Sequence, residues 1–166
     1  MRIAAVIRVA ALLAVASGSA GSLVAQMGDF NAPAKSKSYV VYQAEQQTVP
    51  AGKRSEVEVR FRVVDGFHVN SHTPKSELLI PTQLTLAGKD GVALGTLAYP
   101  AGTPYSFSFD PGTTLDVYEG AFTVKLPVTA KAGEHSVSGT LRYQACDHAA
   151  CYPPKTLAVS IPILAK

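Results

Sequence analysis

The feature that most constrains the fold is an alternation of apolar and polar residues with a period of two. From Glu56 to Val63, four apolar side chains alternate with four charged ones. This spacing puts the apolar side chains on one face of an extended chain, which is typical of a half-buried strand in an antiparallel sheet. Shorter runs of the same kind follow. The positions predicted to form the core are Val57, Val59, Phe61, Val63, Leu84, Leu86, Phe122, Val124, Leu126, Val159 and Ile161.

Turn residues separate these runs, and no apolar stripe with helical spacing follows the first 25 residues. Short strands joined by turns that contain Gly and Pro are typical of sandwiches and barrels. The sequence therefore predicts an all-β chain, and its length suits an immunoglobulin-like antiparallel β-sandwich. The predicted turns are Asp65-Gly66, Lys89-Asp90-Gly91, Asp110-Pro111-Gly112 and Ala132-Gly133-Glu134.

The N-terminal segment has the three parts of a secretory signal peptide: basic residues, a short apolar run and a stretch of small residues. The apolar run is too short to span a bilayer. We therefore predict a signal peptide at 1–25, cleavage near Ala25, export from the cytoplasm and no stable membrane insertion. Residues 26–37 show no periodicity and are predicted to be a flexible leader. The folded domain is predicted to span 38–166.

Composition and charge exclude several classes of protein. Hydrophobic residues make up 47% of the chain and charged residues 16%, which is unlike a disordered protein. Without the two arginines of the signal peptide, 13 basic residues stand against 12 acidic ones, so the mature net charge is +1. This near-neutrality argues against nucleic acid or an anionic membrane surface as an obligatory partner. We expect a monomer.

The two cysteines, Cys146 and Cys151, stand at the end of a predicted hairpin, between a strand ending near Gln144 and another starting near Thr156. Exported cysteines are expected to pair. A bridge closing a loop of about six residues restrains the unfolded chain by only about 2 kcal/mol, against about 4 for a loop of about 60. The bridge is therefore either a local clip or a redox-active disulfide, because short exposed disulfides exchange readily.

Histidines near the cysteines allow a metal site to be considered. Cys146, His148 and Cys151 would suit a soft ion such as Cu(I), but they lack the paired spacing of a zinc site. His68 and His72 would be neighbours only on a helix, so we interpret them as satisfied or exposed side chains. The sequence thus predicts neither a metal nor a cofactor.

A long polar loop is predicted from Pro100 to Thr114, and it carries Tyr105, Phe107 and Phe109. Aromatic side chains in a loop have two interpretations. They either tuck onto the edge of the core or take part in function.

The residues around the cysteines resemble a known family. Tyr143-Gln144-Ala145-Cys146 and Cys151-Tyr152-Pro153-Pro154 are similar to the active-site hairpin of the N-terminal periplasmic domain of DsbD, the thiol:disulfide interchange protein. The stretches Gly66 to Ser71, Leu79 to Thr82 and Val117 to Gly120 are also similar to that domain. The resemblance extends roughly from Tyr39 to Ile163.

This resemblance implies an immunoglobulin-like domain that is located in the periplasm and relays electrons by thiol-disulfide exchange. It would accept them from a thioredoxin-like or membrane reductase and pass them to periplasmic oxidoreductases. Because this sequence contains neither the membrane carrier nor a thioredoxin-like domain, the donor is expected on a separate chain. The implied site consists of the exchanging pair Cys146 and Cys151, the supporting residues Asp147, His148, Tyr143 and Tyr152, and a possible aromatic cap at Phe107 and Phe109.

The resemblance also assigns unequal roles to the cysteines, with Cys151 attacked by partners and Cys146 leaving. Local charge leaves the order open: Asp147 would repel a thiolate approaching Cys146, whereas His148 would stabilise Cys146 as a leaving group. No helix dipole activates cysteines on strands, which favours a relay opened by activated thiols of its partners. The alternative function is a secreted binding or structural sandwich with a non-catalytic hairpin disulfide.

Overall fold

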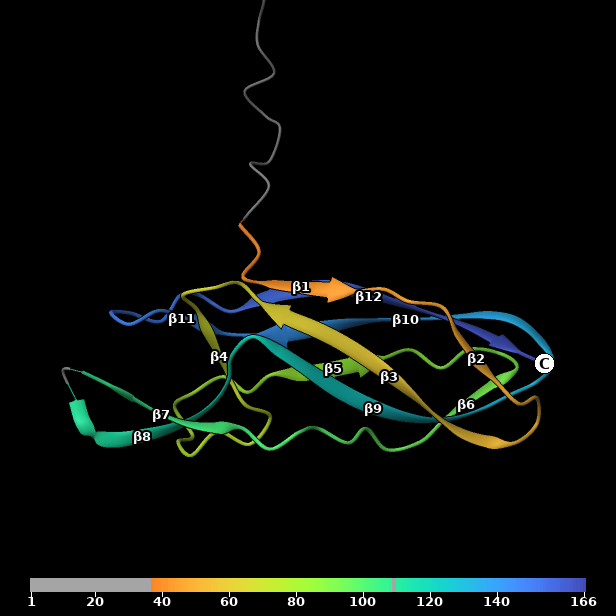
Figure 1. Cartoon of the computed structure of the whole chain (residues 1–166), viewed down its shortest axis with the longest axis horizontal. Coiled ribbons are helices and arrows are strands. Elements are labelled where there is room, and N and C mark those ends of the chain that lie inside the picture. Colours follow the sequence, from red (N-terminus) through yellow and green to blue (C-terminus); the bar gives the residue numbers. More distant parts are fainter. Residues whose placement is uncertain (1–36, 109) are drawn as a thin grey trace, which may run out of the picture. The chain divides into compact units, whose positions relative to one another are not determined.

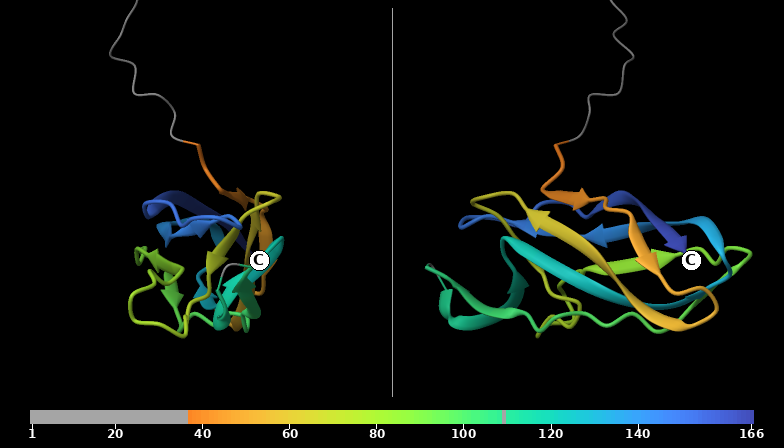
Figure 2. Two further views of the ribbon diagram at one scale, coloured as in Figure 1. Left: turned by 90° about the vertical axis from the view of Figure 1, so that its left-hand side faces the viewer. Right: turned by 45° about the vertical axis from the view of Figure 1, so that its right-hand side comes forward.

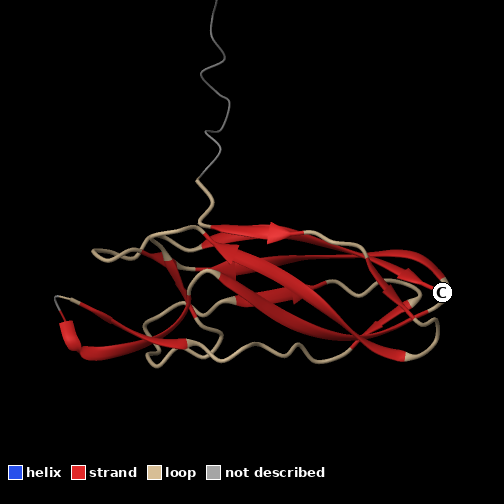
Figure 3. Cartoon of the chain, viewed as in Figure 1, coloured by secondary structure: helices blue, strands red, loops and turns tan. Residues whose placement is uncertain are grey.

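The computed structural model describes residues 37–108 and 110–166. The regular secondary structure of these residues consists of strands alone (Figure 3). The predicted signal peptide, and the leader except for Lys37, lie outside the described residues, so both stay predictions. Within the described residues, no helix is long and apolar enough to cross a membrane.

The strands of the described chain are β1 (Val40–Gln43), β2 (Gln47–Val49), β3 (Arg54–Val63), β4 (His68–Asn70), β5 (Gln83–Leu86), β6 (Val92–Leu94), β7 (Thr103–Phe107), β8 (Asp110–Tyr118), β9 (Ala121–Ala130), β10 (Gly133–Tyr143), β11 (Ala145–Cys146) and β12 (Lys155–Ala165).

These strands form three four-stranded sheets, and the first two are the layers of the sandwich (Figure 1). One layer has the order β1-β3-β9-β6 and the other β2-β12-β10-β5, and their buried side chains join in one core cluster. The third sheet, β11-β4-β8-β7, carries the two cysteines of the hairpin tip near its edge. The prediction of an all-β immunoglobulin-like sandwich is confirmed. Among the described strands, the pairing of β12 with β2 is parallel rather than antiparallel.

The core contains the side chains that the alternation predicts. Phe61, Val63 and Leu126 are at most 1% exposed, and the other predicted positions are buried as well, with one exception. Leu86 is only partly buried against the core. It is the last residue of β5, which is an edge strand of its sheet, so one side of the residue lacks a neighbouring strand.

The prediction of a long loop from Pro100 to Thr114 is wrong. Most of this segment forms the antiparallel hairpin of β7 and β8. Tyr105 pairs with Leu115, and Phe107 pairs with Asp110. The chain thus reverses just before the predicted Asp110-Pro111-Gly112 turn, whose residues belong to β8. Cross-strand pairing outweighs the local turn preference of Pro and Gly here.

Two tight turns bring the third sheet to one end of the sandwich. Gly66 lies between β3 and β4, and Gly120 lies between β8 and β9; both have positive φ values, of 83° and 58°. Glycine adopts this conformation without the steric cost of a Cβ atom. As a result, the β7–β8 hairpin and the tip of the β10–β12 hairpin project from the same end (Figures 1 and 2).

Truncation of the core should be costly. We expect Leu126→Ala to lower the free energy of unfolding by about 2–5 kcal/mol, because it removes buried methyl groups and leaves a cavity. Val41→Ala, at a side chain that is 51% exposed, should change it by less than about 0.5 kcal/mol. Urea unfolding of both variants measures the difference, and equal costs would contradict the assigned core.

Candidate functional site

The two cysteines face each other across the tip of a tight hairpin. β10 and β12 pair from Gly133–Ala165 to Tyr143–Lys155, and beyond them Cys146 and Cys151 form an antiparallel bridge. The amide of Tyr152 donates to the carbonyl of Ala145 at 2.8 Å, and the amide of Asp147 donates to the carbonyl of Ala150 at 2.9 Å. The disulfide joins Cys146 to Cys151 with 3.9 Å between their Cα atoms, so the expected pairing is confirmed.

The two cysteine residues differ sharply in their exposure to solvent. Cys146 is 0% exposed, whereas Cys151 is an exposed residue. The difference arises because β11 pairs on its other side with β4, where Ala145 stands opposite Val69 and Cys146 stands opposite His68. A thiolate arriving from solvent therefore meets Cys151.

Gln144 locks the hairpin to the third sheet, although sequence reasoning did not select it as a site residue. Its side-chain oxygen accepts hydrogen bonds from the Asn70 side chain at 3.2 Å and the Ile80 amide at 3.3 Å. Its amide nitrogen donates to the carbonyl of Tyr152 at 3.3 Å. The signal for this role was its place in the quoted Tyr-Gln-x-Cys motif.

Asp147 closes the tip of the hairpin. One carboxylate oxygen accepts hydrogen bonds from the amides of Ala149 at 2.8 Å and Ala150 at 2.9 Å, and the other accepts from the Tyr152 hydroxyl at 2.5 Å. The hydrogen bond from Tyr152 and those two amides lower the pKa of Asp147 from 3.8 to about 2. The carboxylate thus contacts both arms of the hairpin.

The other predicted supporting residues lie in different surroundings. The Tyr152 ring stacks on Tyr39 with 5.1 Å between centroids, so this residue anchors the arm that carries Cys151. Tyr143 is 1% exposed within the core, and its hydroxyl accepts the amide of Tyr39 at 3.2 Å. This is a structural position. His148 is exposed at the tip.

His68 is a site residue that sequence reasoning missed. It is 2% exposed, it stands opposite Cys146, and its Nε2 atom has no hydrogen-bond partner. Burial lowers the pKa of His68 below its ordinary 6.5, and the charge of Asp147 opposes that shift. The interpretation of His68 as a satisfied or exposed side chain is therefore wrong. It holds for His72, whose Nδ1 lies 3.1 Å from the carbonyl of Thr82.

The β7–β8 hairpin contributes aromatic rings to the same place. The ring centroids of Tyr105 and Phe107 lie 4.0 and 5.9 Å from that of His68. Tyr105 was noticed in the sequence but not selected, and it makes the closer contact. Phe109, the second predicted cap residue, lies outside the described residues. The aromatic hairpin thus covers the histidine that faces the buried cysteine.

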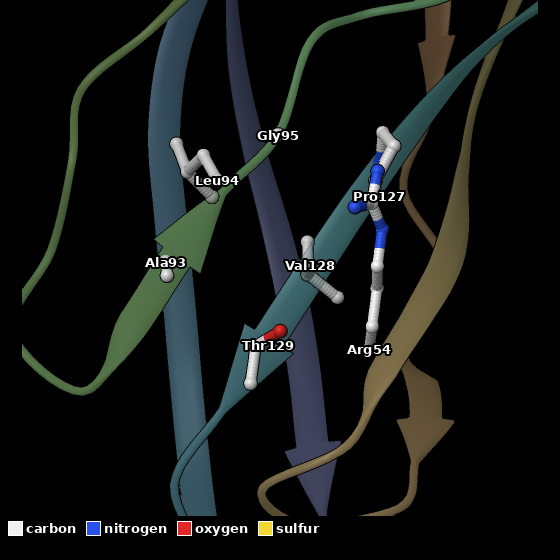
Figure 4. Close-up of a pocket in the computed structure, with 7 residues that line it drawn as sticks. All are labelled: Arg54, Ala93, Leu94, Gly95, Pro127, Val128 and Thr129. Carbon is white, nitrogen blue, oxygen red and sulfur yellow. The ribbon is translucent and has the colours of Figure 1, made fainter.

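Two hollows in the surface of the described residues differ in the side chains that line them. One of about 390 Å³ lies beside the hairpin and is lined by His68, Tyr105, Glu119 and His148, among others. Another, of about 190 Å³, lies between β6, β9 and the start of β3 (Figure 4). No acidic residue, histidine or cysteine lines the second hollow, so it lacks side chains for acid–base chemistry.

The alternative of a metal site finds no support in the part of the chain that the structure describes. No group of three or more His, Cys, Asp or Glu side chains there is arranged to hold an ion. Both sulfurs of the considered site are joined in the disulfide.

Comparison with protein families shows to which family the chain belongs. The family model described as "Thiol:disulfide interchange protein DsbD, N-terminal" matches residues 36–162. The chain belongs to this family. Together with the formed disulfide, membership confirms the predicted relation to proteins of thiol-disulfide exchange.

Individual relatives of the DsbD N-terminal family are distant in sequence. The chain is 26% identical over 106 residues to the thiol:disulfide interchange protein DsbD of Actinobacillus pleuropneumoniae serotype 5b (strain L20), a match that covers 64% of this chain and 16% of that protein. The chain therefore corresponds to a small part of that relative's length.

Solved structures of DsbD N-terminal domains are similar to this chain. The reduced domain from Neisseria meningitidis has a TM-score of 0.43 and 24% identity, over 67% of this chain and 79% of its own. The complex between the DsbD and PilB N-terminal domains of Neisseria meningitidis has a TM-score of 0.43 and 23% identity, over 63% and 73%. The N-terminal periplasmic domain of ScsB from Proteus mirabilis has a TM-score of 0.49 and 7% identity, over 74% and 44%.

Opening the disulfide should leave the domain folded. Because it closes a loop of about six residues, its loss should lower the free energy of unfolding by only about 2 kcal/mol, which a sandwich core tolerates. Far-ultraviolet circular dichroism and urea unfolding with and without dithiothreitol test this. A variant with both cysteines replaced by serine controls for other effects of the reductant. Loss of the β-sheet signal in the reduced wild type, together with its absence from the double-serine variant with and without dithiothreitol, would mark the bridge as structural.

The hydrogen bonds of the Asp147 carboxylate should make the free energy of unfolding depend on pH in the acid range. The depressed pKa of Asp147 means that the ionised carboxylate stabilises the folded state above pH 3.8, and this stabilisation is lost as the pH falls toward about 2. Urea unfolding between pH 6 and pH 2 should therefore show the advantage of wild type over Asp147→Asn shrinking in that window. Asp90→Asn, at the Lys89–Gly91 turn, controls for the loss of one negative charge. A pH-independent difference would contradict the assigned hydrogen bonds.

Proposed function

We propose that this protein is a periplasmic electron relay that works through the Cys146–Cys151 disulfide. It accepts two electrons from a thioredoxin-like or membrane reductase on another chain and passes them to periplasmic oxidoreductases. The observation that carries the proposal is the exposed Cys151 joined to the buried Cys146 in a hairpin of the DsbD N-terminal family.

Unequal exposure supports unequal roles for the two sulfurs. A partner thiolate attacks the Cys151 sulfur, a new disulfide forms between them, the Cys146–Cys151 bond breaks, and its electron pair goes to the Cys146 sulfur. A second thiolate of the partner then attacks the mixed disulfide and releases Cys151. The net change is a reduced hairpin and an oxidised partner. Reversal of these steps toward another partner completes the relay.

The hairpin is built for exchange with a protein rather than for chemistry on a small molecule. The exposed sulfur sits at a projecting tip with no helix dipole to activate it, so an activated thiol must come from the partner. A complex of a DsbD N-terminal domain with the PilB N-terminal domain has been solved for Neisseria meningitidis, which supports a protein partner here.

An aromatic cap is part of the same proposal. The β7–β8 hairpin would shield the redox hairpin, since Tyr105 and Phe107 already pack on the ring of His68, opposite Cys146. The hairpin would cover the side of the redox hairpin that carries Cys146 and leave Cys151 open to a partner. His148 and Asp147 at the tip would then form part of the surface that the partner meets.

Trapping of the mixed disulfide tests the proposal. Each single cysteine variant is first converted to its mixed disulfide with thionitrobenzoate and then mixed with a reduced thioredoxin-like domain whose own resolving cysteine has been removed, so that the partner thiolate displaces thionitrobenzoate. Cys146→Ser, which keeps the exposed sulfur, should accumulate a covalent complex on non-reducing gels. Cys151→Ser should not, because its remaining sulfur is buried.

The opposite pattern would reverse the assigned roles. Absence of a complex with both variants, together with a reduction potential below about −300 mV, would mark the bridge as a structural clip. That outcome would favour the alternative function, a secreted binding or structural module.

A further inference from the structure

His68 is a buried ionisable side chain that the electron relay leaves without a role. It lies in β4, is 2% exposed, and has no hydrogen-bond partner at Nε2. Buried polar atoms are nearly always paired, and one that is not calls for an explanation. A state of the protein in which an acceptor arrives at this nitrogen would supply one.

The strand register places His68 directly across from Cys146, one of the two cysteines of the disulfide. His68 stands directly opposite Cys146 in the antiparallel β4–β11 ladder. Residues opposite each other in such a ladder project from the same face, with Cβ atoms about 4.5–5.5 Å apart. In the oxidised protein the neighbouring sulfur belongs to a disulfide, which is a poor acceptor.

Reduction changes this neighbour chemically. When a partner thiolate bonds to the Cys151 sulfur, the electron pair of the broken bond goes to the Cys146 sulfur, which becomes a thiolate without any proton transfer. Cys146 is 0% exposed, and burial disfavours a thiolate that lacks hydrogen-bond donors. The leaving sulfur therefore needs a donor from the protein.

We propose that His68 is this donor, and that its ring N–H hydrogen-bonds to the Cys146 thiolate when the disulfide opens. The inference rests on the proposed function for the order of attack, with Cys151 attacked and Cys146 leaving. The hydrogen bond would give a role to the unpaired Nε2 atom of His68. It would also stabilise the Cys146 sulfur as the leaving group.

The surroundings of His68 suit a neutral donor. Tyr105 and Phe107 pack on the ring from β7, and burial lowers the pKa of His68, so the imidazole is neutral at pH 7 with one N–H. The negative charge of Asp147, on the hairpin that carries the cysteines, opposes this lowering of the His68 pKa. The charged and titratable groups around the adjoining hollow are Asp65, Glu119 and His148.

The Cys146 thiol pKa gives the first test, measured by thiolate absorbance in the Cys151→Ser background. Replacing His68 by Phe, which keeps the aromatic packing but removes the donor, should raise that pKa by about one unit, a tenfold loss of thiolate. His68→Gln retains an N–H donor and should keep the pKa closer to the wild-type value. His135→Gln, in β10 at the start of its pairing with β12, is the matched control.

Reduction of the intact disulfide by dithiothreitol gives the second test. The rate per dithiothreitol thiolate should fall about tenfold in His68→Phe, while His68→Gln and His135→Gln stay within about threefold of wild type. An unchanged thiol pKa and rate in folded His68→Phe would overturn the proposal. His68→Leu serves as a second apolar replacement, judged in the same way.

A measurement without any change at His68 covers the case in which both apolar variants fail to fold. In ¹⁵N-labelled protein, the Nε2 resonance of His68 should shift when Cys146 of the Cys151→Ser variant ionises, and no shift would overturn the proposal. Dithiothreitol needs no protein partner. A missing covalent complex with a thioredoxin-like domain would therefore reject the relay while leaving the effect of His68 measurable, and the two failures are distinguishable.

Discussion

The chemistry of the site depends on the two-residue ladder between β11 and β4. A disulfide across a tight hairpin joins two residues that stand directly opposite each other. The hairpin by itself would therefore give the two cysteines similar surroundings. The third strand removes this equivalence. β4 pairs with the arm that carries Cys146 and buries it, whereas Cys151 stays exposed. The two ends of the disulfide thereby differ in their exposure to solvent.

Stability and reactivity come from different parts of the chain. The two layers of the sandwich share one core, and the long pairing of β10 with β12 holds the base of the redox hairpin. The tip is held by hydrogen bonds of Gln144 and Asp147 that do not involve sulfur. Because these contacts do not involve the sulfurs, we expect the disulfide to open with little change in the positions of its neighbours.

Electrostatic control of the hairpin differs from that of cysteines at a helix terminus. Within the described residues no helix is present to lower a thiol pKa through its dipole. The nearby charge is the carboxylate of Asp147, which the Tyr152 hydroxyl and two tip amides hold in its ionised form. Under the proposed function, such a site relies on an activated thiol of its partner, which suits an intermediate carrier of electrons.

The sequence by itself determined the all-β class, the core side chains of β3 and β9, the pairing of Cys146 with Cys151 and the family, because alternation and closely spaced motifs are local properties. It did not reveal that the segment around Tyr105 forms a hairpin, nor that His68 lies opposite Cys146. It also left open which sulfur is exposed. These features depend on the register between strands far apart in the chain. Only tertiary structure decides them, because a local pattern specifies which face of a strand is buried but not which strand lies beside it.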